Sequence, residues 1–210
     1  SDGVSYESAH DWVKLTVVGA TTTPFTVMAV GQTTDVTVTL SPDSPGTNVT
    51  VSLNPLEGTG DARFWPSGQA STTLTASATL TVTGVTASST ASNLLLRVLL
   101  AGEPLVSNRF TVLKVDILDP EENDVYLKGE EVKFDGDVEP TGLSGLTYAW
   151  SVLEGTCDPA TATTEDFQTT LKSEGTIKVK LAATVGGTTC EKIRTIEAVL
   201  PEVTKLSWKN

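Results

Sequence analysis

The residues that could do chemistry are few in this 210-residue chain, which holds one histidine, two cysteines and twenty-six carboxylates. The histidine, His10, has no serine, cysteine or acid beside it in a catalytic motif. The sequence has no nucleophile elbow, metalloprotease helix, P-loop or dinucleotide-binding fingerprint. Carboxylates are numerous enough for a glycosidase pair, but nothing in the sequence places two of them on opposite walls of a cleft. We therefore predict a protein that is not an enzyme and needs no cofactor.

Cys157 and Cys190 are the only cysteines, and they predict a disulfide within the C-terminal half of the chain. An even pair of cysteines in an exported β-protein is more often bridged than free. On the chain-entropy account, closing a loop of 33 residues (190 − 157) stabilises a domain by about 3.5–4 kcal/mol. Two thiolates with no histidine nearby supply only half of a zinc shell, so a metal site is not expected at these cysteines.

A dense block of carboxylates lies in the middle of the chain. Residues 115–140 carry ten carboxylates and two lysines, a local balance of −8 within a net charge of −12. Asp119, Glu121 and Asp124 are candidates for calcium ligands, because hard cations prefer oxygen donors. The block has no D-x-D-x-D-G loop, and the alternative is a solvated face of an acidic protein. We expect the solvated face and no resident metal.

Phe64 and Trp65 are adjacent aromatic residues that precede a Pro-Ser-Gly turn. Neighbouring side chains of a strand point to opposite faces, so one of the two is expected at the surface. Sugar rings stack on exposed aromatic rings, which makes the pair a candidate ligand contact; the alternative is packing at the edge of a sheet. Asn48 begins an Asn-Val-Thr acceptor for N-glycosylation, which has meaning only in a eukaryotic secretory protein.

The charge and hydropathy of the chain limit its partners. A uniform negative field repels phosphate backbones and anionic lipid, so nucleic acid and membrane surfaces are not expected to bind. No run approaches the roughly 18–20 apolar residues of a membrane span, and no positively charged start precedes an apolar core as in a signal peptide. We expect a piece of a longer protein, with any export signal or anchor outside this sequence.

The elements that must position these residues are strands, because apolar residues recur with a period of two along the whole chain. Valine, leucine or isoleucine alternates with threonine, serine or lysine in DVTVTL (35–40), NVTVSL (48–53) and TIKVKL (176–181). This alternation predicts antiparallel strands with one buried and one solvated face, that is, an all-β fold. The expected strands are 12–18, 25–30, 34–40, 47–53, 61–65, 72–75, 78–83, 93–100 and 107–112, followed by 115–118, 124–127, 131–138, 146–153, 166–171, 176–185 and 189–199.

The buried phase of the alternation shifts by one residue between Val112 and Leu113. Such a shift turns a strand to its other face, which is expected where the chain leaves one core and enters another. We therefore predict two β-sandwich domains, 12–114 and 115–200, with no flexible linker between them. Residues 1–11 are expected to be a linker or tag remnant, and residues 201–210 a linker or the start of a further domain.

Two features predict how the second domain is arranged. Gly186 and Gly187 stand between two alternating runs, and both can take the positive φ of a type I′ turn, so the last two strands should form a hairpin. Trp150 shares a strand face with Tyr148 and Val152, and we expect it to anchor the core.

The second domain resembles an immunoglobulin-like domain of the polycystic-kidney-disease (PKD) type, through GEEVKFDGDV, LTYAWSV and SEGTIKVKLAATVGG. The family's Asp-x-Gly-Asp-Gly turn after the tryptophan is replaced by SVLEGTCDP. The first domain is similar to the bacterial immunoglobulin-like repeats of secreted, multi-domain surface proteins, through DVTVTLSPDSPGTNVTVSL, SATLTVTGVTAS and AGEPLVSNRFTVLKV. The resemblance implies two tandem immunoglobulin-like β-sandwiches.

In the proteins that this chain resembles, such repeats are spacers and adhesive stalks. We therefore expect a non-enzymatic spacer or adhesion segment of a larger secreted or cell-surface protein. The alternative is a carbohydrate- or protein-binding accessory module of an exported enzyme. The expected partners are other domains of the same polypeptide, and an extracellular protein or polysaccharide.

Overall fold

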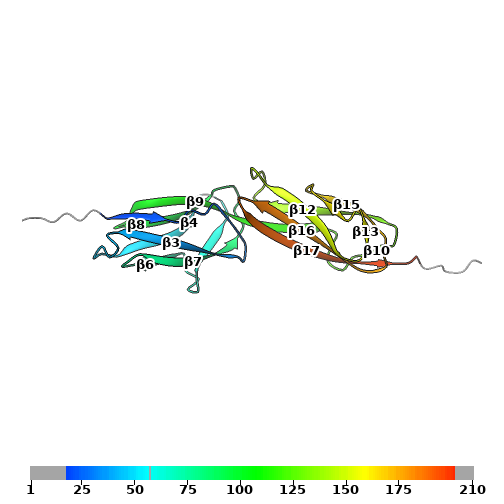
Figure 1. Cartoon of the computed structure of the whole chain (residues 1–210), viewed down its shortest axis with the longest axis horizontal. Coiled ribbons are helices and arrows are strands. Elements are labelled where there is room, and N and C mark those ends of the chain that lie inside the picture. The colour runs from blue at the N-terminus through cyan, green and yellow to red at the C-terminus, as the bar shows by residue number, and fades with distance from the viewer. Residues whose placement is uncertain (1–17, 57, 202–210) are drawn as a thin grey trace, which may run out of the picture.

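The computed structural model describes residues 18–56 and 58–201, and every regular element in them is a β-strand. The predicted all-β class is therefore confirmed. Figure 1 shows the strands in two groups placed end to end, with the blue N-terminal strands at one end and the red C-terminal strand at the other. The strands are β1 (Gly19–Thr22), β2 (Val27–Ala29), β3 (Thr33–Ser41), β4 (Val49–Pro55), β5 (Asp61–Trp65), β6 (Ser71–Leu74), β7 (Ala78–Thr86), β8 (Leu94–Leu100), β9 (Glu103–Asp119), β10 (Val125–Leu127), β11 (Glu131–Glu139), β12 (Thr147–Glu154), β13 (Cys157–Asp158), β14 (Thr161–Ala162), β15 (Phe167–Leu171), β16 (Gly175–Val185) and β17 (Thr188–Val199).

The N-terminal group of strands has two layers. One sheet has the order β1-β3-β7-β5, and the strands β9-β8-β4-β6 form the other layer. Along β3, Val36, Val38 and Leu40 are buried, whereas the threonines between the valines and the leucine are wholly or partly exposed. Buried residues of both layers form one cluster, here called the N-terminal core, which also contains Phe64 and Phe110. Alternation along the strands therefore supplies the apolar face of each layer.

The C-terminal group is also two-layered, with a sheet β10-β17-β16-β12-β14 and the strands β9-β11-β15-β13. Its buried residues form a second cluster, the C-terminal core. Trp150 is 2% exposed and stacks on Phe167 with 5.7 Å between ring centroids, while Phe134 lies 6.2 Å from the same tryptophan. The indole Nε1 donates a hydrogen bond to the carbonyl of Thr164 at 3.0 Å. Trp150 is thus a core anchor, as predicted.

Strand β9 is shared by the two groups. The sequence predicted separate strands at 107–112 and 115–118, but the structure has one strand of 17 residues that pairs first with β8 and then with β11. Phe110 and Val112 belong to the N-terminal core, and Leu113, Val115 and Ile117 belong to the C-terminal core. The predicted shift in the buried phase is confirmed, and no loop separates the two cores at this point.

Most predicted strands lie within a few residues of observed ones, and 61–65 coincides with β5. The glycine hairpin is confirmed, because β16 pairs antiparallel with β17 and the φ angles of Gly186 and Gly187 are 57° and 80°. The short strands β1, β13 and β14 were missed, since two to four residues without an apolar alternation carry no strand signal. The predictions for residues 1–11 (with His10), for the strand 12–18 and for the tail 201–210 lie outside the described residues, except at Val18 and Pro201, neither of which belongs to a strand.

Candidate functional site

The junction between the two groups of strands is held by backbone hydrogen bonds. Strand β2 pairs in parallel with β9 across the point where β9 changes core, from Val27 opposite Thr111 to Ala29 opposite Leu113. The amide of Val30 donates to the carbonyl of Leu113 at 2.8 Å, and the amide of Thr111 donates to the carbonyl of Thr26 at 2.9 Å. A short N-terminal strand therefore braces β9 on both sides of the core boundary.

The β16–β17 hairpin adds contacts from the C-terminal group to the N-terminal group. The Thr188 hydroxyl donates to the carbonyl of Val27 at 3.0 Å, and the Gln32 amide Nε2 donates to the carbonyl of Thr189 at 3.1 Å. The Val27 side chain packs against the C-terminal core. A β-carbon on Gly186 would lie 3.3 Å from a methyl group of Val27, which shows how closely the turn approaches β2. The two groups of strands thus pack against each other at the joint.

Two loops lie side by side in the N-terminal group: one between β4 and β5, of which residues 56 and 58–60 are described, and residues 87–93 between β7 and β8. The Leu56 amide donates to the carbonyl of Asn93 at 2.6 Å, and the Asn93 amide group donates to the carbonyl of Thr59 at 2.6 Å. A β-carbon on Gly58, whose φ is 67°, would collide with the Ser89 hydroxyl. Glycine is therefore needed where the two loops touch.

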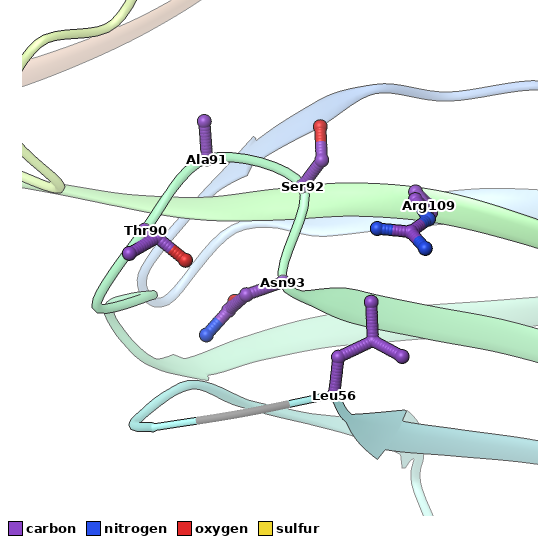
Figure 2. A pocket seen from close by; sticks show the side chains of 6 residues that line it. All are labelled: Leu56, Thr90, Ala91, Ser92, Asn93 and Arg109. Carbon is purple, nitrogen blue, oxygen red and sulfur yellow. The ribbon is translucent and has the colours of Figure 1, made fainter.

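A hollow of about 280 Å³ opens between these loops and β9, and we call it the inter-loop hollow. Figure 2 shows the side chains of Arg109, Asn93 and Leu56 around it, with Thr90, Ala91 and Ser92 along the loop. Its lining residues are Leu56, Thr90, Ala91, Ser92, Asn93 and Arg109. Five of the six are polar or small, so the hollow suits a polar ligand better than an apolar one.

Arg97 on β8 and Arg109 on β9 share the solvent-facing side of this layer, and neither forms an ion pair with another described residue. Arg63 pairs with Asp61 and Arg194 with Glu122, but no ion pair is formed by Arg97 or Arg109 in the described part of the chain. Arg109 lies opposite Leu95, two residues from Arg97, so the two arginines occupy diagonal positions on one face. The face is locally positive in a protein of net charge −12. The sequence analysis missed this site because its residues are dispersed along the chain.

The predicted aromatic pair is split by the sheet. Phe64 is 3% exposed and belongs to the N-terminal core, whereas Trp65 is 66% exposed. Trp65 ends the edge strand β5 opposite Thr81, whose hydroxyl donates to the Asp35 carboxylate at 2.7 Å. The row from Trp65 through Thr81 to Asp35 crosses three strands, so an aromatic ring, a hydroxyl and a carboxylate share one solvent-facing surface.

The predicted disulfide between Cys157 and Cys190 is not formed; both thiols are free. Cys157 pairs with Leu171, and Gly155, two residues before it, lies against Ile177 near the start of β16, whereas Cys190 lies opposite Ala183 near the junction. Ile177 and Ala183 are six residues apart, or about 20 Å along the strand, and a disulfide needs α-carbons within about 7 Å. An even number of cysteines in the sequence does not show how far apart they lie in the fold. Burial raises the pKa of both thiols.

The acidic block is distributed over strands and turns. The Asp124 carboxylate accepts a hydrogen bond from the amide of Glu121 at 3.0 Å, which closes the turn after Asp119. Among the described residues, no group of three or more histidine, cysteine or acidic side chains is arranged to hold a metal ion.

One carboxylate cluster on the C-terminal group has shifted pKa values. Lys133 pairs with Asp166 at 2.8 Å and approaches Asp135 at 3.9 Å. The hydrogen bond to Asp166 raises the pKa of Asp135, helped by burial and by the charges of Asp166 and Asp119. The Lys133 ammonium holds the pKa of Asp166 below its usual value. Asp119, Asp135 and Asp166 thus lie near one lysine, and Asp135 is the carboxylate whose ionisation is disfavoured.

A second hollow of about 380 Å³ lies beside the β11–β12 loop and is lined by Val138, Thr141, Gly142, Leu143, Leu146, Tyr148 and Glu165. Burial raises the pKa of Tyr148, and the charges of Glu165, Asp137 and Asp166 raise it further. The surroundings of this hollow are acidic and it has no lining cation. It therefore offers no pairing for an anion, unlike the inter-loop hollow.

No family model matches this chain, and no curated protein matches it either. Within the described residues, no helix is long and apolar enough to cross a membrane.

Proposed function

We propose that this chain is a pair of immunoglobulin-like β-sandwiches that acts as a stiff, non-enzymatic spacer or adhesion segment of a larger secreted or cell-surface protein. Its partners would be neighbouring domains of the same polypeptide and an extracellular protein or polysaccharide. The resemblance of both halves to immunoglobulin-like repeats supports the fold, and the separation of the buried residues into two cores supports the division near residue 114.

The observation that carries this proposal is the continuity of β9 through both cores. A linker of flexible residues would let two domains turn freely, but here the same strand pairs with β8 and β11. The parallel pairing of β2 with β9 and the contacts of the glycine hairpin fix the joint further.

The positions of the described ends suit a spacer. Gly19 pairs with Ser41, at the end of β3 away from the junction, and Val199 pairs with Leu127, at the end of β17 away from the junction. Figure 1 shows these ends at opposite extremes of the long axis. A chain that enters at one end and leaves at the other adds its full length to a series of domains.

Small-angle scattering tests the stiffness with a matched pair of proteins. We compare the natural chain with a variant that has Gly-Gly-Ser-Gly inserted between Val112 and Leu113. The natural chain should give the pair-distance distribution of one elongated particle, and the insertion should broaden it by freeing the joint. If the two distributions coincide, the continuity of β9 does not control the shape, and the spacer proposal fails.

A second candidate function, a carbohydrate-binding accessory module, is favoured by the exposure of Trp65. The indole face and the hydroxyl of Thr81 could contact a sugar ring and its hydroxyl groups. Affinity electrophoresis through soluble xylan, soluble cellulose derivatives and glycol chitin tests this role. Retardation that is lost in Trp65→Ala but kept in Val85→Ala would support it, because Val85 is the other large exposed apolar residue on β5 and β7. Equal migration of all three proteins in every gel would exclude it.

A further inference from the structure

The inter-loop hollow is built on buried polar side chains. Ser88, Asn93 and Thr111 are at most 3% exposed, and they are three of the five buried polar residues in the described chain. A buried polar group costs stability unless it is hydrogen-bonded. Here each one binds the loop: the Ser88 hydroxyl accepts from the Val112 amide at 2.9 Å, and the Thr111 hydroxyl accepts from the Ser92 amide at 2.8 Å. The loop 87–93 is therefore held in one shape before any ligand arrives.

The backbone of this loop is also strained at one point. Ser92 has a φ of 55°, a left-handed conformation that a serine adopts at a cost. The hydrogen bond from its amide to Thr111 maintains that conformation. A loop held rigidly in an unfavourable conformation loses little further entropy when a ligand binds.

The groups that line the hollow define the chemistry of its ligand. Arg109 offers a planar guanidinium with no ion-pair partner among the described residues, which matches the two oxygens of a carboxylate. Thr90 and Ser92 are exposed and bring hydroxyl groups, which can both donate and accept hydrogen bonds as sugar hydroxyls do. Leu56 provides an apolar side against which the carbon face of a ring can lie. At about 280 Å³ the hollow is close to the lower limit of ligand pockets, about 300 Å³.

We propose that the inter-loop hollow binds an acidic sugar residue, with its carboxylate on Arg109 and its hydroxyl groups on Thr90 and Ser92. A phosphate ester carries nearly two charges against one lining cation, in a protein whose net charge of −12 repels polyanions. This binding site is independent of the spacer role, since it needs only the N-terminal group of strands.

Backbone amide NMR of the full chain tests the proposal with three probes. Galacturonate carries the ring and the carboxylate, galactose has the ring without the carboxylate, and acetate has the carboxylate without the ring. Galacturonate should shift the amide signals of Ser92, Asn93 and Arg109 in a saturable way at millimolar concentration. Galactose and acetate should bind at least about tenfold more weakly, because each lacks one set of contacts.

Two arginine variants complete the experiment. Arg109→Gln should weaken galacturonate binding by about tenfold or more, because it removes a charged hydrogen-bond donor from the hollow. Arg97→Gln removes the same charge from the same face but does not line the hollow, so its binding should stay within about twofold. Both residues are on strand surfaces, and unchanged amide spectra elsewhere would show that the variants fold.

Several results would overturn the proposal. One is an absence of shifts in this loop with galacturonate at about 50 mM, where a millimolar ligand saturates. Equal binding of galactose would show that the carboxylate is not recognised, and equal binding of acetate would show that the ring is not. Equal losses in Arg109→Gln and Arg97→Gln would mean that only the general charge of the face matters.

Discussion

Truncating Phe134 to alanine should destabilise the C-terminal group of strands far more than the N-terminal group. Phe134 is fully buried and packs against Trp150 and Phe167, with centroid distances of 6.2 Å and 5.9 Å. Deleting a buried phenylalanine ring costs about 3–5 kcal/mol. The C-terminal group spans 88 residues (113–200), for which the free energy of unfolding is about 4–13 kcal/mol. The substitution therefore removes a large part of that stability.

Calorimetry and amide hydrogen exchange measure this effect. The melting temperature of the C-terminal group should fall by at least about 12 °C, since each kcal/mol shifts a domain of this size by about 4–8 °C. Amides of β3 and β7 should keep most of their protection, because these strands contribute no residue to the C-terminal core. Phe110→Ala is the matched control: Phe110 is buried in the N-terminal core, 4.7 Å from Phe25, and its loss should have the opposite pattern. If either variant lowers protection equally in both groups, the two cores are not separate.

Four further predictions concern individual residues. Ellman's reagent should find two thiols, Cys157 and Cys190, in the unfolded oxidised protein and should react slowly with the folded protein. If it finds no thiol in the unfolded protein, the disulfide predicted from the sequence is formed. Asp116→Asn should lower the free energy of unfolding at pH 7 by about 0.2–1 kcal/mol. Burial opposes the ionisation of Asp116, but Lys192, the Ile117 amide and Lys114 lower its pKa, so the effect should fade as the pH falls below 3.8. A constant difference between the melts of the two proteins from pH 2 to 7 would contradict this. Asp135→Asn should raise the melting temperature at pH 7, because the raised pKa of Asp135 means that its ionisation disfavours folding as the pH rises. The gain in melting temperature should shrink in acid. A lower melting temperature of the variant at pH 7 would refute the prediction. Gly186→Val should disturb the amide signals of β2, whereas Gly187→Val should not. Both substitutions place a side chain at a positive φ, but only Gly186 faces Val27. Identical spectra of the two variants would contradict the packed joint.

Local signals in the sequence were sufficient for much of the fold. The bounds of β5, the turn at Gly186 and Gly187, and the change of buried face between Val112 and Leu113 all depend on residues close together in the chain. The alternation of apolar and polar residues cannot show whether two consecutive predicted strands are one continuous strand, so β9 was predicted as two strands. It also cannot detect strands of two residues such as β13 and β14, which exist only because a neighbouring strand pairs with them.

The candidate site was harder to predict, because it depends on contacts between distant residues. The hollow joins Leu56, the loop 87–93 and Arg109, and in the sequence Arg109 was only a polar position in a strand. The cysteine pair failed for the related reason that sequence separation contains no information on which end of a sandwich each cysteine occupies. The pair Phe64 and Trp65 was predicted to place one ring at the surface, since adjacent side chains of a strand face opposite sides, and the structure shows that the exposed ring is Trp65.

The most direct test of the stiff spacer is the relative orientation of the two groups of strands in solution. Residual dipolar couplings of backbone amides can be measured for β3, β4, β7 and β8 and separately for β11, β12, β15 and β16. If β9 and the hairpin contacts fix the joint, both sets should fit one alignment tensor with the same magnitude and axes. Two tensors of clearly different magnitude would show independent motion of the groups and contradict the proposed function.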